Sequence, residues 1–185
     1  AVLNKEPIGI IGDYDVDGLV SASILFKYLQ PYCPVTVKIP DRFNDGYGPN
    51  LRFLEEFEQS NINLIITVDC GSNSVDLISK KNDLDIIIFD HHQTDQLDIG
   101  FANVNPNRDD DKSGLNYLAA AGVVFLAIIS LNRELRNRDF FKNSSSDWDL
   151  LQFVPLVAMA TIADVVPLRK LNRALVKQGL ILYAR

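Results

Sequence analysis

The sequence predicts an α/β protein with a mostly parallel sheet and helices on both of its faces. Three runs typical of buried strands, residues 8–11, 64–68 and 85–89, alternate with segments whose apolar residues recur every three or four positions. Strands that alternate with helices are joined by right-handed crossovers, which make neighbouring strands parallel. Each run also stops at acidic or histidine residues, which are therefore expected at the carboxyl edge of one sheet, where ligands bind in open α/β folds.

The composition is that of a globular protein with one well-buried core. Of its 185 residues, 47% are hydrophobic and 23% are charged, a balance without any sign of disorder. The net charge of −6 argues against binding of nucleic acid through bulk charge, although divalent cations would offset part of it. The longest apolar run, residues 118–131, is shorter than the roughly 20 residues of a membrane span, so no membrane association is expected.

The opening residues and the cysteines indicate whether the chain is part of a longer protein and in which compartment it lies. The first residues contain neither a Met nor a signal-peptide pattern, so we expect a piece of a longer protein. Cys33 and Cys70 lie in unrelated apolar segments, so neither a zinc site nor a disulfide framework is indicated. This cysteine usage favours a reducing, cytoplasmic compartment.

The first predicted strand runs directly into three carboxylates, Asp13, Asp15 and Asp17, with Gly18 leading into an apolar helical pattern. Carboxylates this close together repel one another unless a positive charge lies between them. A hard divalent cation such as Mg²⁺ or Mn²⁺ is the simplest answer, because such ions take carboxylate oxygens. The alternative is an acidic, solvated loop in which Asp17 is the N-cap of the following helix.

The same pattern recurs after the other two predicted strands. Asp69 ends the second strand, and Asp90, His91 and His92 end the third. A single histidine at a strand end is more often a hydrogen-bonded structural residue, but here the only two histidines of the chain directly follow an acid. Neutral imidazole is a good ligand for Mn²⁺, and Asp90 is placed to orient a ring as a hydrogen-bond acceptor.

A loop of mixed chemistry follows a short strand expected over residues 35–39. Residues 40–48 hold one basic side chain, two aromatic rings and two glycines, an unusual mixture for a simple connection. One interpretation is a substrate-contacting loop, in which Arg42 makes a bidentate contact with a phosphate and a nucleobase stacks on the ring of Tyr47. The other is a structured turn in which Arg42 pairs with a nearby acid.

Asp164 is a further candidate ligand. It is the one acid in residues 151–168, and a buried lone carboxylate is costly unless it is paired or bound to a metal. In the alternative interpretation it caps a helix or pairs with an arginine. By contrast, Asp109, Asp110 and Asp111 follow no strand, and we expect them in a solvated surface turn.

The remaining elements follow from the same periodicities. Helices are expected over residues 19–29, 50–60, 75–81, 117–131, 150–161 and 171–183. A loop is expected over residues 101–114, and a charged surface connection over residues 132–146.

Four short motifs resemble, in order, the signature motifs of the DHH phosphoesterase superfamily. They are Asp13-Tyr14-Asp15-Val16-Asp17-Gly18, Val68-Asp69-Cys70-Gly71, Asp90-His91-His92 and Ala163-Asp164-Val165-Val166-Pro167-Leu168. Residues 41–48, Asn103-Val104-Asn105-Pro106 and residues 172–176 are further similar to the RecJ-like single-strand exonucleases of that superfamily. The match covers almost the whole chain. It implies one DHH domain over residues 1–185, without the second, DHHA1-type domain that closes over the cleft in RecJ-like proteins.

The resemblance implies a two-metal hydrolase, with Mn²⁺ or Mg²⁺, that removes nucleotides from a 5′ end of single-stranded DNA in repair and recombination. Carried over residue by residue, the resemblance implies that the metal ligands are Asp15, Asp17, Asp69, His91 and Asp164. It implies that Asp69 bridges both ions, and Asp13 belongs to the same motif. It also places Arg42 at the terminal 5′ phosphate and His92 near the scissile phosphate. Water activated by the two ions, rather than a side chain, is the expected nucleophile.

Two other hypotheses stay open at this point. A DHH phosphodiesterase could act on short oligonucleotides, cyclic dinucleotides or pyrophosphate; such members usually have a histidine four residues before the position of Asp15, where Ile11 stands. A non-catalytic scaffold with the DHH fold is expected to have decayed motifs, whereas all four motifs here keep their ligand types. Single-strand binding protein and a helicase are candidate partners. Without a second domain, the chain is expected to bind metal but to hydrolyse DNA poorly.

Overall fold

The computed structural model describes residues 1–81, 83–97, 99–142 and 147–184. Within these ranges the sheet has five strands, all parallel, in the order β2-β1-β3-β4-β5. The strands are β1 Ile8–Gly12, β2 Val35–Lys38, β3 Leu64–Val68, β4 Asp85–Phe89 and β5 Ala102–Val104. The helices are α1 Val16–Leu29, α2 Leu51–Gln59, α3 Val75–Ile78, α4 Ala120–Asn137, α5 Val154–Ala163 and α6 Lys170–Tyr183, with short 3-10 helices η1 Val2–Asn4 and η2 Leu150–Phe153.

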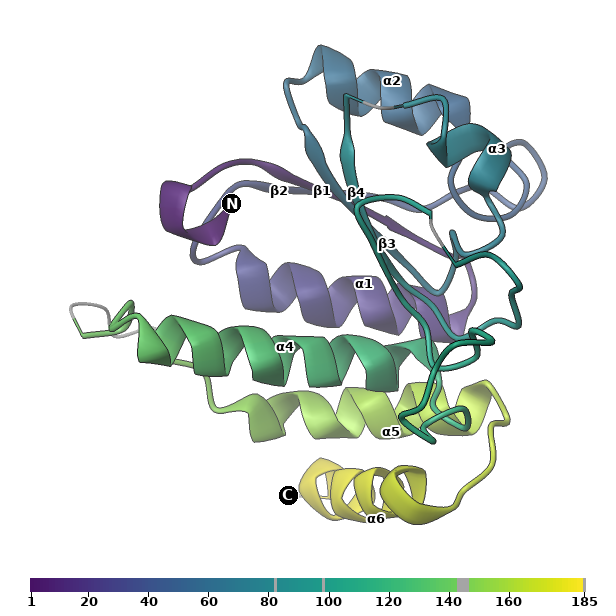
Figure 1. The fold of residues 1–185 in the computed structure, drawn as a ribbon. Coiled ribbons are helices and arrows are strands. Elements are labelled where there is room, and N and C mark those ends of the chain that lie inside the picture. Colours follow the sequence, from purple (N-terminus) through teal and green to yellow (C-terminus); the bar gives the residue numbers. More distant parts are fainter. Residues whose placement is uncertain (82, 98, 143–146, 185) are drawn as a thin grey trace.

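Helices cover both faces of the sheet, which confirms the predicted fold class (Figure 1). α2 and α3 lie on one face, and α1 and α4 lie on the other. α5 packs against α1 and α4, and α6 packs in turn on α5, so this side of the molecule is several helices deep. None of the described helices is both long and apolar enough to span a membrane.

The central strands are buried on both sides, which explains why they are continuously apolar rather than alternating. Successive side chains of β1 enter different cores: Ile10 packs with the α1 side, and Ile11 packs with the α2 side. β3 repeats this division with Ile66 and Ile65. Because both faces are occupied, the register of these strands is fixed, and the positions of their last residues are fixed with it.

The register brings the residues that follow four strands to one edge. Gly12 pairs with Val68, Val68 with Phe89, and Phe89 with Val104. The residues that come next along the chain, Asp13, Asp69, Asp90 and Asn105, therefore lie at the carboxyl edge of the sheet. The backbone ladder reaches into the acids, since the N–H groups of Asp13, Asp69 and Asp90 donate to carbonyls at the ends of the neighbouring strands.

Strand β5 corrects the expectation of a loop over residues 101–114. Its three residues, Ala102–Val104, carry no hydrophobic run that periodicity could detect. It is a strand because it pairs with β4 from Ile87 to Phe89, which is a tertiary contact rather than a local preference. The correction matters for function, since it adds another strand end to the edge.

Several helix boundaries also differ from the prediction. α4 starts at Ala120 and continues to Asn137, through part of the predicted surface connection, because its charged residues are exposed helix formers while Leu135 is buried. Residues 143–146 of that connection lie outside the described residues. The helix predicted over 150–161 is divided into η2 and α5, and α3 ends at Ile78. α1 begins at Val16, so Asp17 lies in its first turn.

Candidate metal centre

Side chains from four separate parts of the chain converge at the carboxyl edge of the sheet. Nε2 of His91, after β4, lies 3.2 Å from Oδ1 of Asp69, after β3, and 3.6 Å from Oδ2 of Asp164, at the end of α5. The same nitrogen lies 3.8 Å from Oδ2 of Asp17, in the first turn of α1. Residues that are distant in the sequence thus share one small volume.

Three overlapping groups of ligand atoms are close enough together to hold a cation. Within each group the ligand atoms lie within 4.8 Å of one another. The groups are Asp13, Asp15 and Asp69; Asp69, His91 and His92; and Asp17, His91 and Asp164. Asp69 and His91 each belong to two groups, so two neighbouring ions could share them. We call Asp13, Asp15, Asp17, Asp69, His91 and Asp164 the candidate metal centre.

The turn after β1 is built closely around Gly18. Asp15 is the N-cap of α1, and its Oδ1 accepts a hydrogen bond of 3.0 Å from the N–H of Gly18. A Cβ atom on Gly18 would lie 2.5 Å from the carbonyl oxygen of Asp13, so a larger residue would displace the turn. The alternative in which Asp17 caps this helix is therefore wrong, because Asp15 is the cap.

Asp17 instead lies buried between α1 and the start of α4. Its two carboxylate oxygens accept hydrogen bonds from the N–H groups of Ala120 (2.6 Å) and Ala121 (2.9 Å), and the residue is 1% exposed. Burial raises the pKa of Asp17 to about 6, although these two hydrogen bonds act in the opposite direction. Asp17 thus joins the candidate metal centre to α4, a contact that no local sequence pattern indicated.

Asp69 lies at the middle of the centre. Burial, and then the charges of Asp17 and Asp15, raise the pKa of Asp69 to about 10. Its φ angle of 62° is a left-handed conformation that few residues other than glycine adopt. The hydroxyl of Tyr47 donates a 2.9 Å hydrogen bond to its backbone carbonyl. A strained backbone and a strongly raised acid pKa at one residue are typical of functional sites.

Three carboxylate oxygens of the centre are free to accept a hydrogen bond or to coordinate a cation. Oδ1 of Asp13, Oδ1 of Asp69 and Oδ2 of Asp164 are buried without a hydrogen-bond partner among the described residues. Burial raises the pKa values of Asp13 and Asp164, as it does that of Asp69. Buried carboxylates of this kind are costly unless they are paired or coordinate a metal. Carboxylate and imidazole ligands suit Mn²⁺, and carboxylates suit Mg²⁺, so either ion fits this set of donors.

Asp90 holds His92. Oδ1 of Asp90 lies 2.8 Å from Nδ1 of His92. Burial alone would raise the pKa of Asp90, but hydrogen bonds and charge from His92 outweigh it and hold this pKa at about 2. The hydrogen bond to Asp90 in turn raises the pKa of His92. The His92 side chain is 42% exposed and that of His91 is 12% exposed, so His92 faces solvent while His91 lies inside the centre.

Asp164 is the half-buried C-cap residue of α5. A negative charge at a helix C-terminus opposes the helix dipole, so stabilising the helix does not explain an acid here. Among the described residues its ion-pair contact is with His91 rather than with an arginine. Asp164 thus occupies a helix-cap position, as one alternative had it, but its ion-pair contact is with His91 and not with an arginine.

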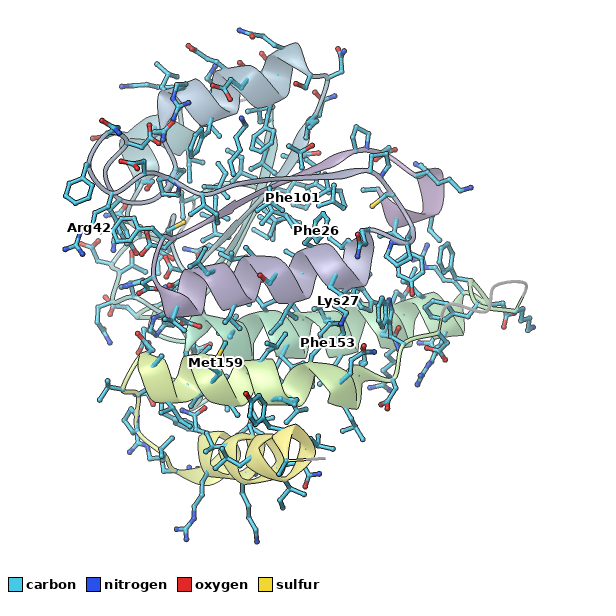
Figure 2. The ribbon with its side chains drawn as sticks, turned by 180° about the vertical axis from the view of Figure 1, so that it is seen from behind. Phe26, Lys27, Arg42, Phe101, Phe153 and Met159 are labelled. Carbon is cyan, nitrogen blue, oxygen red and sulfur yellow. The ribbon has the colours of Figure 1, made fainter. Side chains whose placement is uncertain are left out.

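Arg42 and Tyr47 lie on the loop beside the centre. The described residues give Arg42 no ion pair; instead Asp45 pairs with Arg52, and the Arg42 guanidinium lies 5.6 Å from the centre of the Tyr14 ring. Arg42 is exposed at the outer edge of the molecule, on the side where α1 begins (Figure 2). The Tyr47 hydroxyl is committed to Asp69, while the residue stays 52% exposed.

The second run of acids is exposed to solvent, as predicted. Asp109, Asp110 and Asp111 are exposed, and Asp110 pairs with Arg108 at 2.8 Å. Sequence reasoning missed a different group near the centre, consisting of the buried side chains of Ser72 and Asn105. The available signal was the family resemblance of Asn103-Val104-Asn105-Pro106, which implied no role for Asn105, and the strand β5 that precedes Asn105 was not predicted.

The fold and the site define a class: an α/β protein with acidic and histidine side chains that could hold a metal ion at the carboxyl edge of a parallel sheet. The sequence profile described as "DHH family, N-terminal domain" matches residues 7–154. The chain belongs to the DHH family, and the resemblance drawn from its motifs is confirmed.

Curated relatives and solved structures are similar to almost the whole chain. The single-stranded-DNA-specific exonuclease RecJ of Bacillus subtilis is 36% identical over 184 residues, which cover 97% of this chain and 22% of the relative. The crystal structure of exonuclease RecJ bound to manganese is similar with a TM-score of 0.81 and 32% identity, over 97% of this chain and 44% of that one. RecJ of Thermus thermophilus in complex with Mg²⁺ gives a TM-score of 0.62 and 30% identity, over 98% and 21%. The chain therefore spans less than a third of the B. subtilis relative's length.

Proposed function

We propose that this chain is the metal-binding DHH domain of a RecJ-like 5′-to-3′ exonuclease that hydrolyses single-stranded DNA. The observation that carries the proposal is the convergence of Asp17, Asp69, His91 and Asp164, with Asp13 and Asp15 beside Asp69, at one edge of the sheet. The similarity of almost the whole chain to RecJ supports the same reaction.

The residues divide into ligands and substrate-facing groups. We assign Asp15, Asp17, Asp69, His91 and Asp164 to two Mn²⁺ or Mg²⁺ ions, with Asp69 shared and Asp13 as an additional ligand. When bound, such ions activate water and stabilise the attacking and leaving oxygens of an in-line displacement. This assignment also accounts for the acids themselves, since a pair of dications neutralises carboxylates that otherwise repel one another.

We assign His92 to the scissile phosphate. Its ring is exposed toward solvent, and Asp90 fixes it through Nδ1 at 2.8 Å. This leaves Nε2 for substrate, since its nearest polar contact, with the Tyr47 hydroxyl, is long at 3.4 Å. The raised pKa of His92 favours the protonated ring, which can donate a hydrogen bond or a proton to a phosphate oxygen. Asp90 orients this ring and does not itself reach the substrate.

Arg42 and Tyr47 are assigned to the DNA. Arg42 has no acidic partner among the described residues, and its guanidinium can fork onto the two oxygens of a terminal phosphate. Tyr47 is fixed through its hydroxyl and still half exposed, so its ring can contact the sugar or base of the first nucleotide. Recognition of a terminal phosphate would make the enzyme start at a 5′ end.

The wider setting follows from the same proposal. A single-strand 5′ exonuclease serves DNA repair and recombination in the cytoplasm of a bacterial cell, where single-strand binding protein and a helicase supply its substrate. We also propose that residues 1–185 act together with a second, DHHA1-type domain, which would cover the candidate metal centre and add basic surface to an acidic chain.

The test is degradation of a single-stranded oligonucleotide labelled at its 3′ end, with MnCl₂ and an excess of protein. The proposal expects metal-dependent shortening from the 5′ end, faster with a 5′ phosphate and lost in Asp69→Ala. A chain extended at its carboxyl end should be faster. Faster cleavage of a dinucleotide or a cyclic dinucleotide would identify a small-substrate phosphodiesterase instead. Absence of both Mn²⁺ binding and hydrolysis would indicate a non-catalytic scaffold.

A further inference from the structure

Two asparagine side chains from the end of β5 hold the backbone of the two histidines. Nδ2 of Asn105 donates a 2.8 Å hydrogen bond to the carbonyl oxygen of His92, and Nδ2 of Asn107 donates a 2.6 Å hydrogen bond to that of His91. Asn107 is itself fixed, since its N–H donates to Oδ1 of Asn105 at 2.8 Å. We call Asn105 and Asn107 the amide clamp.

Asp90 holds the backbone N–H groups of the same two histidines. Its Oδ1 accepts hydrogen bonds from the N–H of His91 (2.7 Å) and from the N–H of His92 (3.1 Å). The N–H groups of both histidines are therefore held by one carboxylate, and their carbonyl groups by the two amides. Fixed on both sides, this backbone leaves the imidazole rings little freedom beyond their own side-chain torsions.

Asn105 also connects the histidines to the loop that follows Asp69. Its Nδ2 lies 2.9 Å from Oγ of Ser72, a residue that is fully buried. The N–H of Ser72 donates to Oδ2 of Asp90 at 3.0 Å, and the Ser72 carbonyl accepts a 3.1 Å hydrogen bond from the hydroxyl of Thr94. One buried network thus fixes the loops after β3 and β4 relative to each other.

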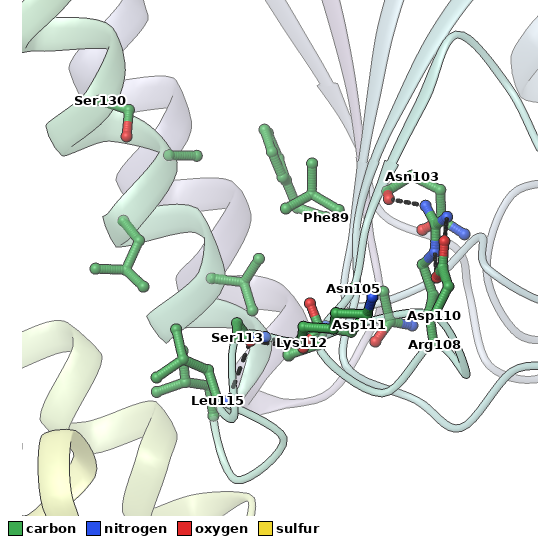
Figure 3. Close-up of a pocket in the computed structure, with 16 residues that line it drawn as sticks. Phe89, Asn103, Asn105, Arg108, Asp110, Asp111, Lys112, Ser113, Leu115 and Ser130 are labelled. Carbon is green, nitrogen blue, oxygen red and sulfur yellow. Dashed lines mark hydrogen bonds and ion pairs between the residues drawn. The ribbon is translucent and has the colours of Figure 1, made fainter. Parts of the chain in front are cut away.

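Asn105 is buried, but on one side it borders a cavity rather than packed side chains. It is 4% exposed, and it lines one side of a cavity of about 650 Å³ between β5 and α4. Figure 3 shows Asn103, Asn105 and Arg108 on the strand side of this cavity, across from Ser130 on α4. Open space on this side means that apolar packing alone does not hold the side chain, so its hydrogen bonds must do so.

We propose that Asn105, supported by Asn107, is a positioning residue for the metal centre: it fixes His91 as a ligand and His92 as the substrate-facing ring. The inference rests on the proposed function, because it is toward bound ions that the rings are positioned. Partners that orient metal ligands typically change metal affinity 10- to 100-fold when they are removed. Asn105 acts one step further away, through the backbone of the ligand, so we expect a loss of about 10-fold.

The competing explanation is that Asn105 is only a buried structural amide. Asn132 provides the matched control, because it is 1% exposed and also hydrogen-bonded, to the hydroxyl of Tyr28 at 3.0 Å, but belongs to α4 and makes none of the contacts around the histidines. Loss of either amide leaves buried partners unsatisfied, so both variants should lose thermal stability. Only loss of Asn105 should change the centre.

The experiment compares wild type, Asn105→Ala, Asn107→Ala and Asn132→Ala. Binding of MnCl₂ is measured by titration calorimetry, and the ring nitrogens of the two histidines are observed by ¹⁵N NMR in metal-free protein. We expect Asn105→Ala to weaken Mn²⁺ binding about 10-fold and to shift both histidine signals, while Asn132→Ala leaves affinity and signals at wild-type values. The milder Asn107→Ala, which removes one donor at a half-buried position, serves if Asn105→Ala does not fold, and should give an intermediate loss.

The outcomes separate this proposal from the proposed function. Tight Mn²⁺ binding by wild type and undiminished binding by both clamp variants would overturn the positioning role and leave the metal centre intact. An equal loss in Asn132→Ala would also overturn it, because the effect would then be one of general stability. If wild type binds no Mn²⁺, the proposed function fails and the positioning role fails with it.

Discussion

The carboxylate of Asp17, in the first turn of α1, accepts the N–H of Ala120 at the start of α4 at a distance of 2.6 Å. The first N–H groups of a helix have no partner within the helix, and residue Ala119 at the N-cap has no side chain that could accept them. Asp17 fills this role across the fold, with its charge at the positive end of the helix dipole. One residue therefore serves as a candidate metal ligand and as the cap of a core helix.

Replacement of Asp17 should consequently affect both stability and metal binding. Asp17→Ala is expected to destabilise the metal-free protein by about 1–3 kcal/mol, since two buried N–H groups lose their acceptors. It should also weaken Mn²⁺ binding. Asp149→Ala is the control, because Asp149 caps η2 through the N–H of Leu151 at an exposed site. Denaturant unfolding with EDTA and calorimetry with Mn²⁺ would measure both effects; unchanged metal affinity in Asp17→Ala would remove Asp17 from the ligand set.

Replacement of Asp69 by asparagine should stabilise the metal-free protein. The pKa of Asp69 is raised from 3.8 to about 10, so the folded state holds this proton more tightly than the unfolded chain. The associated stability is fully present below pH 3.8 and is lost progressively as the pH rises toward 10. Asp69→Asn cannot ionise and avoids this loss, with an expected gain of about 1–3 kcal/mol at roughly pH 8 in EDTA.

Addition of metal should reverse the order of thermal stability of wild type and Asp69→Asn. Mn²⁺ is expected to raise the melting temperature of wild type, because it binds only the folded state, and to leave that of Asp69→Asn nearly unchanged. Asp109→Asn, at an exposed acid outside the centre, should match wild type throughout. Melting curves from about pH 5 to 9 test this, and an Asp69→Asn protein that is less stable than wild type near pH 8 in EDTA would contradict the assignment.

The Asp90 and His92 pair sets the charge of the substrate-facing ring. The hydrogen bond from His92 to Asp90 raises the pKa of His92, so the stability contributed by this pair is present at low pH and is lost as the pH rises through the His92 pKa. Asp90→Asn should lower the His92 pKa, because the ring loses its charged hydrogen-bond acceptor, while the one remaining oxygen can still accept the N–H groups of His91 and His92. Because the chain has two histidines, an NMR titration reports this directly; an unchanged pKa would show that Asp90 does not control the ring.

Gly18 should tolerate no side chain. A Cβ atom at this position would meet the backbone of Asp13 at 2.5–2.7 Å, whereas one at Gly122, in the first turns of α4, would meet only the side chain of Leu118 at 3.3 Å. Gly18→Ala is therefore expected to destabilise the fold by roughly 2–4 kcal/mol through displacement of the acid turn. Gly122→Ala should stay within about 1 kcal/mol of wild type. Comparable unfolding midpoints for the two variants would show that the turn can move.

The sequence was most informative where hydrophobic burial decides the structure. β1, β3 and β4 are apolar on both faces, so their existence and their acidic ends could be predicted from residues 8–11, 64–68 and 85–89. Convergence of Asp69, His91 and Asp164 followed from parallel topology together with the family motifs.

Tertiary contacts decided what could not be predicted. β5 exists only through pairing with β4, so the placement of Asn105 at the same edge stayed hidden. The cap that Asp17 provides for α4 joins residues more than a hundred positions apart, which no local pattern records. The N-cap of α1 is Asp15 rather than Asp17. Because the two carboxylates are only two residues apart, the sequence could not decide which of them caps the helix without knowledge of the first helical residue.

The metal assignment depends on two cations that lie at this edge and share Asp69. Anomalous scattering from a crystal soaked in MnCl₂ would locate them. We expect two manganese peaks, both within coordination distance of Asp69, one near His91 and Asp164 and the other near Asp13 and Asp15. A single peak that avoids Asp69, or manganese bound only at the exposed acids 109–111, would contradict the assignment.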